Sequence, residues 1–254
     1  MDNLTEKENS LIIGRNAVSE ALKSGRPIDT LFVAKGDKNG SVGQIIAKCS
    51  EKGIVIKQVE RKKLDTMCDG AAHQGVAAYA AAHDYSSVDD IFALAESRGE
   101  QPFIIICDGI EDPHNLGAII RSAEAGGAHG VIIPKRHSTS LNYTVGKASA
   151  GAVEYLPVAR VANLPSEIDE LKKRGVWIYS ADMDGQDWCS VDYSGGVGLV
   201  IGSEGNGVSR LVKEKSDFTV SLPMKGKVNS LNASVAAGIL IYEVSRQRSL
   251  IERR

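Results

Sequence analysis

Three short polar segments of this chain carry side chains that could bind or activate a substrate. The first is Gly202-Ser203-Glu204-Gly205-Asn206-Gly207, which follows the apolar run Val197–Ile201. The second contains Asn115 and Arg121, and the third is Asn229-Ser230-Leu231-Asn232. A strand, a glycine turn and a helix often hold a nucleotide-like ligand, because glycine lets the backbone approach closely and leaves its amides pointing outward.

The glycine segment does not fit the two common phosphate-binding motifs. A P-loop needs Lys-Ser/Thr after its second glycine, and none follows here. A dinucleotide fingerprint needs G-x-G-x-x-G, whereas these glycines stand at Gly202, Gly205 and Gly207. Glu204 lies inside the turn and would repel a pyrophosphate. The turn therefore favours a ligand that is neutral or cationic near Glu204, and an ordinary strand-to-helix turn is the alternative.

The polar residues near Arg121 allow several interpretations. Arg121 is flanked by apolar residues, so it could be partly enclosed, and it would then need a carboxylate such as Glu204 or a phosphate as partner. The carboxylates and histidine of residues 108–114 could suggest a metal site, but no second ligand cluster supports one, and we predict none. Ser203 does not stand in a G-x-S-x-G elbow, which argues against a serine hydrolase.

The composition is typical of a soluble globular protein, with 43% hydrophobic and 24% charged residues in a chain of 254. The formal net charge of −2 argues against a dedicated nucleic-acid binder but allows an enzyme with a local basic patch. No apolar run reaches the roughly 20 residues of a membrane span, and the first ten residues lack the apolar stretch of a secretory signal. The four scattered cysteines favour reduced thiols and a cytoplasmic location.

Helix-like and strand-like segments alternate along most of the chain, which predicts two α/β domains. Residues 1–10 are predicted to be a disordered tail, and residues 11–82 a small α/β domain. Residues 83–101 break the rhythm and are predicted to be a linker before a second domain at 102–254. Its short apolar strands, such as Phe103–Cys107, are typical of a parallel sheet covered on both faces. Ligands of such sheets bind at the carboxyl ends of the strands, where three loops rich in polar groups are expected to meet.

Together the three segments resemble the three motifs of the SpoU (TrmH) family of RNA ribose 2′-O-methyltransferases, which belong to the SPOUT class. The matching stretches are Asn115–Ala123, Ile201–Gly207 and Ser230–Ala236, in the family's order and at similar spacing. Residues 14–18 and 73–76 resemble the RNA-binding extension of the RlmB-type members, which modify a guanosine in 23S ribosomal RNA. Ala233, where many members carry valine, is a minor departure.

This resemblance implies a parallel-sheet SPOUT domain with a C-terminal trefoil knot, preceded by a small α/β RNA-binding domain. It also implies a homodimer, S-adenosylmethionine as methyl donor, and 23S rRNA or an assembling large subunit as substrate. The implied catalytic residues are Arg121, Asn115, Glu204, Ser230 and Asn232. The implied cofactor-binding residues are Gly202, Leu222, Leu231, Ser180, Ile201, Gly207, Met224 and Ala233. The candidate RNA-binding residues are Arg15, Asn16, His73, Gln74, Lys135, Arg136 and Lys147.

The chemistry expected of Arg121 is electrostatic. A guanidinium has a pKa above about 12, so it is a poor base. We expect it to stabilise the developing alkoxide of a ribose 2′-hydroxyl, or to use an RNA phosphate as proton relay. Asn115 and Asn232 would orient the reacting groups, and Ser230 would help to place the nucleotide.

Two alternatives stay open at this point. The first is a tRNA 2′-O-methyltransferase, although the N-terminal domain favours rRNA. The second is an RNA-binding or antibiotic-target-masking protein that has the fold but no turnover. The polar residues retained in all three motifs argue against that second alternative.

Overall fold

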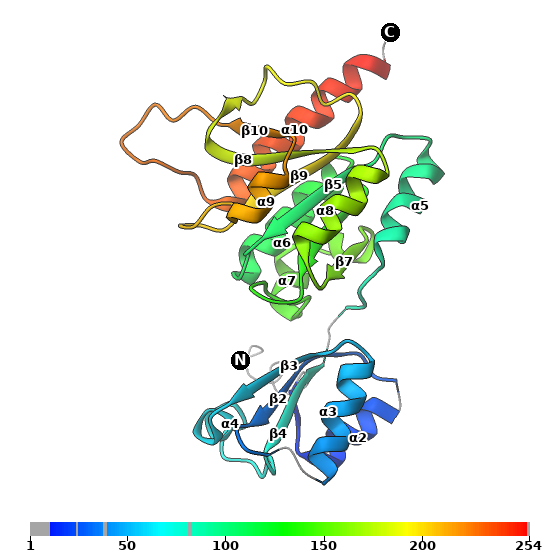
Figure 1. Cartoon of the computed structure of the whole chain (residues 1–254), viewed down its shortest axis with the longest axis vertical. Helices are drawn as coiled ribbons and strands as arrows, with labels where there is room; N and C mark the ends of the chain where they lie inside the picture. Colours follow the sequence, from blue (N-terminus) through cyan, green and yellow to red (C-terminus); the bar gives the residue numbers. More distant parts are fainter. Residues whose placement is uncertain (1–10, 24, 38–39, 81–82, 253–254) are drawn as a thin grey trace. The chain divides into compact units, whose positions relative to one another are not determined.

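A computed structural model of the chain describes residues 11–23, 25–37, 40–80 and 83–252 (Figure 1). The predicted disordered tail, residues 1–10, lies outside the described residues. The chain divides into two compact units. The N-terminal unit comprises residues 1–84 with 140–143, and the C-terminal unit comprises residues 85–139 with 144–254.

The N-terminal unit is built on a four-stranded sheet with the strand order β1-β4-β2-β3. β4 is antiparallel to β1 and β2, whereas β2 and β3 are parallel. Side chains alternate along β2, so Leu31 and Val33 pack with α2 and α3, while Phe32 packs with Leu64 of α4. The elements are β1 (Leu11–Ile13), α2 (Arg15–Lys23), β2 (Ile28–Ala34), α3 (Ser41–Glu51), β3 (Val55–Val59), α4 (Arg61–Met67) and β4 (Val76–Ala80).

The C-terminal unit contains a six-stranded sheet with the order β10-β8-β9-β5-β6-β7, in which every neighbouring pair is parallel. The predicted parallel sheet is therefore confirmed. Its strands are β5 (Phe103–Asp108), β6 (Gly130–Pro134), β7 (Val158–Val161), β8 (Val176–Asp187), β9 (Gly196–Gly202) and β10 (Phe218–Ser221). Its helices are α5 (Val88–Arg98), α6 (Pro113–Ala125), α7 (Tyr143–Ala148), α8 (Leu164–Lys173), α9 (Arg210–Lys215) and α10 (Ala233–Glu252), with a 3₁₀ turn at Ala152–Glu154.

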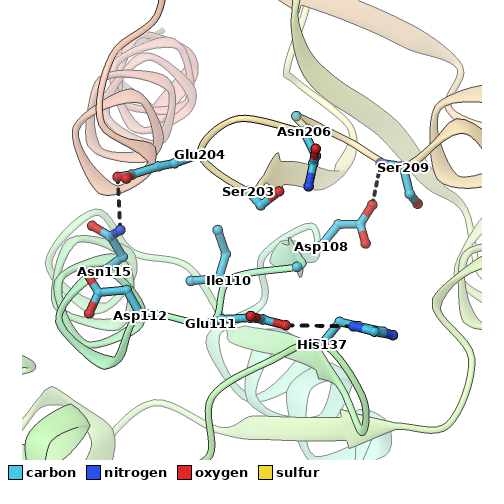
Figure 2. A pocket seen from close by; sticks show the side chains of 12 residues that line it. Asp108, Ile110, Glu111, Asp112, Asn115, His137, Ser203, Glu204, Asn206 and Ser209 are labelled. Atoms are coloured by element: carbon cyan, nitrogen blue, oxygen red, sulfur yellow. Dashed lines mark hydrogen bonds and ion pairs between the residues drawn. The ribbon is translucent and has the colours of Figure 1, made fainter.

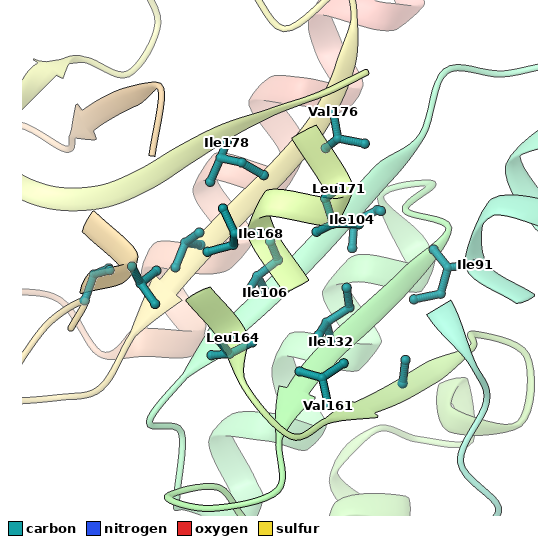
Figure 3. Close-up of a cluster of buried hydrophobic side chains, with 14 residues drawn as sticks. Ile91, Ile104, Ile106, Ile132, Val161, Leu164, Ile168, Leu171, Val176 and Ile178 are labelled. Atoms are coloured by element: carbon teal, nitrogen blue, oxygen red, sulfur yellow. The ribbon is translucent and has the colours of Figure 1, made fainter. Parts of the chain in front are cut away.

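Helices cover both faces of this sheet (Figure 1). On one face, Ile104 and Ile106 of β5 pack with Ile168 of α8 and Ile91 of α5 (Figure 3). On the other face, α6 and α10 pack against each other, and α10 also contacts β9. The predicted linker, residues 83–101, therefore contains a helix whose Ile91 is fully buried in the core of the C-terminal unit.

None of the described helices is both long and apolar enough to cross a membrane. The trefoil knot that the family resemblance implies stays a prediction.

His129 connects the start of β5 to the strand beside it and makes the stability of the fold depend on pH. Its fully buried ring accepts a hydrogen bond from the amide of Phe103 at Nδ1 (2.9 Å), and its Nε2 lies 3.1 Å from a Glu100 carboxylate oxygen. Burial lowers the pKa of His129, opposed by the nearby Glu100 charge. Protonation at Nδ1 would also remove the acceptor that Phe103 uses.

Because the pKa of His129 lies below its unfolded value of about 6.5, the unfolded chain binds a proton that the folded chain does not. The free energy of unfolding is therefore expected to fall as the pH drops below about 6.5, by at most about 1.4 kcal/mol per pH unit from this group. Urea unfolding at several pH values between 5 and 7.5 measures this slope. His129→Gln should reduce it, and substitution of the exposed His114 by alanine should not. Equal slopes in wild type and His129→Gln would contradict the assignment.

Candidate active site

The ends of two adjacent strands bring the first two polar segments together. β5 ends at Asp108 and β9 ends at Gly202, and these two residues are register partners. The glycine turn after β9 closes through two backbone hydrogen bonds between Ser203 and Gly207 (3.0 and 3.1 Å). A Cβ at Gly202 would lie 2.1 Å from the carbonyl carbon of Gly207, so only glycine allows this close approach.

Glu204 is the centre of a hydrogen-bonded group that joins all three polar segments. Its Oε1 accepts hydrogen bonds from Asn115 Nδ2 (3.0 Å, Figure 2), from Asn232 Nδ2, and from the amide of Ala233 (3.3 Å). Asn232 Nδ2 also donates to Asn115 Oδ1 (2.9 Å). Three of the five predicted catalytic residues are therefore in direct contact, although they are up to 117 positions apart in the sequence.

The orientation of Asn232 is fixed by the helix that follows it. Its Oδ1 accepts hydrogen bonds from the amides of Ser234 (3.0 Å) and Val235 (3.2 Å), which caps the N-terminus of α10. Because its oxygen caps the helix, its amide nitrogen must face Glu204 and Asn115. The two polar atoms of the Asn232 amide thus have separate roles: Oδ1 caps α10, and Nδ2 contacts Glu204.

A cavity of about 410 Å³, which we call the apolar cavity, lies on one side of the glycine turn. Seven of the eight predicted cofactor-binding residues line it: Gly202, Leu222, Leu231, Ile201, Gly207, Met224 and Ala233. Ser230 lines it as well. Ser180 does not, because it is fully buried and its hydroxyl bonds to β10 through Phe218 O and Thr219 Oγ1. Asp182 and Met183 also line this cavity, although no motif of the sequence points to them.

A second cavity of about 480 Å³, the polar cavity, shares Asn206 and Gly207 with the apolar cavity (Figure 2). Its remaining lining residues are Asp108, Gly109, Ile110, Glu111, Asp112, Asn115, His137, Ser203, Glu204 and Ser209. Asp108 accepts a hydrogen bond from the amide of Ser209 (2.7 Å), and His137 Nδ1 lies 3.7 Å from Glu111 Oε1. Within the described residues, no group of three or more His, Cys, Asp or Glu side chains could hold a metal ion.

Arg121 is exposed, which corrects the expectation that it is partly enclosed. It lines neither cavity, and among the described residues it has no hydrogen-bond or ion-pair partner. Its apolar sequence neighbours Ile119 and Ile120 are fully buried, but adjacent residues of a helix point in different directions. The face of α6 that holds Asn115 is therefore not the face that carries Arg121.

The predicted RNA-binding residues differ in accessibility. His73 is buried, its Nε2 lies 2.8 Å from Asp65 Oδ1, and its Nδ1 accepts from the amide of Gly75 (2.9 Å). This burial does not favour a direct contact of His73 with RNA, because both ring nitrogens already have partners within the protein, and the contact stays a prediction. Arg15 Nε donates to the carbonyl of Gln74 (2.8 Å). The exposed members of the set are Asn16, Gln74, Arg136 and Lys147, and Lys135 is half-buried.

Known proteins match both units of the chain. The model of the SpoU rRNA Methylase family matches residues 102–242, and the model for RNA 2′-O ribose methyltransferase substrate binding matches residues 11–86. YacO of Bacillus subtilis strain 168, assigned to the TrmH family of tRNA/rRNA methyltransferases, is 51% identical over 96% of this chain and 98% of its own length.

Solved structures agree with these matches. The SpoU methyltransferase AviRb from Streptomyces viridochromogenes, in complex with AdoMet, has a TM-score of 0.60 and 25% identity over 98% of this chain and 95% of its own. A TrmH/SpoU tRNA modifying enzyme from A. aeolicus has a TM-score of 0.55 and 30% identity, but covers 60% of this chain and 78% of its own. The fold is that of the SPOUT methyltransferases, with a substrate-binding domain before the catalytic one. The chain belongs to the SpoU rRNA methylase family.

Proposed function

We propose that this protein transfers a methyl group from S-adenosylmethionine to the 2′-hydroxyl of a guanosine ribose in 23S rRNA. The observation that carries the proposal is the contact of Glu204 with Asn115 and Asn232 between two cavities that share one glycine turn. One cavity suits a methyl donor, and the other suits a nucleoside. A methyl transferase needs both to open onto one reaction centre.

The chemistry of the apolar cavity fits S-adenosylmethionine. Its volume lies within the range of small-molecule sites, and its walls include the side chains of Leu222, Met224 and Leu231. None of its described lining residues is a lysine, arginine or histidine, whereas Asp182 adds a negative charge. A ligand with apolar parts and a net positive centre suits such walls better than a phosphate does. When bound there, S-adenosylmethionine supplies an electrophilic methyl carbon.

The polar cavity suits the target nucleoside. Its wall carries the carboxylates of Asp108, Glu111, Asp112 and Glu204, which would repel an RNA phosphate. A sugar and a base, by contrast, carry hydroxyl and amine groups that donate hydrogen bonds to carboxylates. Asn115 borders this cavity and contacts Glu204, so it would orient the ribose toward the glycine turn.

Arg121 would complete the site in a homodimer. α10 carries an exposed apolar stripe, which we define as Val235, Ile239 and Tyr242, with exposed fractions of 49%, 36% and 55%. Residues spaced by three and four positions lie on one face of a helix, and α6, which carries Arg121, packs beside α10. A second copy covering this stripe would bring the exposed guanidinium close to the interface.

Ile239→Asp is expected to convert a dimer into a monomer and to abolish methyl transfer, because a buried unpaired carboxylate is costly. Light scattering coupled to gel filtration measures the molecular mass. Leu211→Asp, at an exposed apolar position of α9 rather than of α10 (51% exposed), is the matched control and should remain dimeric. A monomeric wild type with full activity would contradict the homodimer.

The choice of rRNA over tRNA is supported by the N-terminal unit. It matches the substrate-binding model, and the tRNA modifying enzyme from A. aeolicus aligns with only 60% of this chain. tRNA is the second candidate, because YacO and other relatives are named as tRNA/rRNA methyltransferases.

The test of the proposed function uses radiolabelled S-adenosylmethionine and three unmodified RNAs: 23S rRNA, 16S rRNA and a tRNA pool. Label in 23S rRNA alone is expected. Label only in tRNA would overturn the choice of substrate. Absence of label from all three, with free RNA and with large-subunit precursor particles, would overturn methyl transfer itself.

A further inference from the structure

Part of β8 leaves the regular pairing of the sheet beside the apolar cavity. β8 pairs with β10 through Ser180 and Thr219, but the next residue of β10, Val220, pairs with Gln186. Residues 181–185, which we call the β8 bulge, are therefore additional on the β8 side. Bulges of this kind re-aim side chains and often lie next to active sites.

The β8 bulge forms part of the cavity wall. Ala181, Asp182 and Met183 all line the apolar cavity. Met183 is 71% exposed, although its side chain is apolar. A thioether is flexible and polarizable, and it makes favourable contacts with aromatic rings. An exposed methionine on the wall of a ligand cavity is therefore suited to cover the ring of a bound ligand.

Lys213 ties the β8 bulge to α9 through two of the bulge's carboxylates. Lys213 of α9 donates hydrogen bonds from Nζ to Asp182 Oδ2 (2.8 Å) and to Asp184 Oδ1 (2.8 Å). The other oxygen of Asp182 accepts a hydrogen bond from the amide of Met183 (2.7 Å). The lysine thus bridges the two carboxylates on either side of Met183, and one of those carboxylates fixes the backbone of Met183.

The charge balance of the cluster favours this bridge. Two carboxylates two positions apart repel each other unless a cation lies between them. The hydrogen bond from Lys213 lowers the pKa of Asp184, and the bonds to Asp182 and Asp184 raise the pKa of Lys213. Asp184 and Lys213 therefore stay charged at neutral pH. Without the lysine, Asp182 and Asp184 lose their tie to α9 and the cation that offsets their repulsion, although Gly185 keeps its hydrogen bond from Ser221 Oγ.

We propose that Lys213 is a positioning residue for the methyl donor: it holds the β8 bulge as a wall of the apolar cavity, where Met183 contacts the bound adenosyl group. This inference rests on the proposed function, because it takes the apolar cavity as the site of S-adenosylmethionine. Lys213 itself does not line the cavity and acts through Asp182.

The chain offers a matched control on the same helix. Lys215 has nearly the same side-chain exposure as Lys213 (35% against 31%) and also bonds a carboxylate, Asp169 of α8, at 2.6 and 2.7 Å. Asp169 lines neither cavity. Lys215→Met thus removes an equivalent ion pair without touching the cavity wall.

The experiment compares Lys213→Met, Lys215→Met and Lys213→Arg by calorimetric titration with S-adenosylhomocysteine. Loss of a preorganised wall is expected to raise the Kd of Lys213→Met by about 10-fold. Lys215→Met should stay within about two-fold of wild type and Lys213→Arg within about three-fold, since arginine can still bridge two carboxylates. In turnover, Lys213→Met should raise the KM for S-adenosylmethionine and leave the KM for RNA and kcat nearly unchanged.

Equal Kd values for Lys213→Met and Lys215→Met, or a failure of Lys213→Arg to rescue binding, would overturn the inference. If Lys213→Met does not fold, Met183→Ser replaces it, because so exposed a side chain contributes little to folding. The Kd of Met183→Ser for S-adenosylhomocysteine must then be higher than that of wild type. A Kd equal to that of wild type overturns the contact between Met183 and the adenosyl group. A wild type that does not bind S-adenosylhomocysteine would overturn the proposed function and this inference together. If wild type binds S-adenosylhomocysteine and Lys213→Met has the same Kd, only this inference is overturned and the proposed function is not.

Discussion

Arg121→Ala is expected to lower kcat for methyl transfer by about 100- to 1000-fold, the effect of removing one donor that stabilises a developing oxyanion. The Kd of S-adenosylhomocysteine should stay within two-fold of wild type, because Arg121 lines neither cavity. Its side chain is exposed and has no partner among the described residues, so its truncation costs the folded chain little. Single-turnover kinetics and calorimetry on the same protein sample separate the two quantities.

Two further variants control for the charge of Arg121. Arg210→Ala removes another exposed arginine, one that pairs with Glu214, and should leave kcat unchanged. Arg121→Lys keeps the charge but loses the planar fork of donors, so we expect only partial activity. An Arg121→Ala variant with wild-type kcat would remove the role assigned to this residue.

Glu204→Ala is expected to have the second largest effect, a loss in kcat of about 100-fold, which is the typical cost when reacting groups are misplaced by about 1 Å. Glu204 Oε1 is the acceptor that holds Asn115, Asn232 and the first amide of α10 in one arrangement. Alanine leaves these donors without their common partner. Steady-state kinetics with RNA as the varied substrate should show the loss mainly in kcat.

Glu204→Gln distinguishes geometry from charge. A glutamine oxygen can still accept the same hydrogen bonds, so this variant should keep more activity than Glu204→Ala. Glu214→Ala, which removes an exposed carboxylate bonded to Arg210, is the control and should behave as wild type. If Glu204→Ala also behaves as wild type, the contacts between the three segments do not support catalysis.

The sheet of the C-terminal unit could be predicted because each of its strands is a short, strongly apolar segment of the sequence. Phe103–Cys107 reads as a strand buried on both faces, and the structure places it in β5, between β9 and β6. Parallel strands also end at one edge, so the proximity of Asn115, Glu204 and Asn232 followed from their positions after strands and at a helix start.

The errors concern contacts between residues distant in sequence. The β8 bulge arises from the register with β10, so no local pattern marks Asp182 and Met183 as part of a cavity wall. The accessibility of a side chain is a second limit: His73 is buried and contacts Asp65, whereas Arg121 is exposed although Ile119 and Ile120 beside it are buried.

The atom that receives the methyl group distinguishes a ribose 2′-O-methyltransferase most directly from any other methyltransferase. The protein should be incubated with 23S rRNA and S-adenosylmethionine labelled in its methyl group, and the RNA should then be digested to nucleosides and analysed by mass spectrometry. We expect the label in a guanosine that is methylated at the ribose 2′-oxygen. Label on a nucleobase, or no transfer by protein that binds S-adenosylhomocysteine, would contradict this expectation.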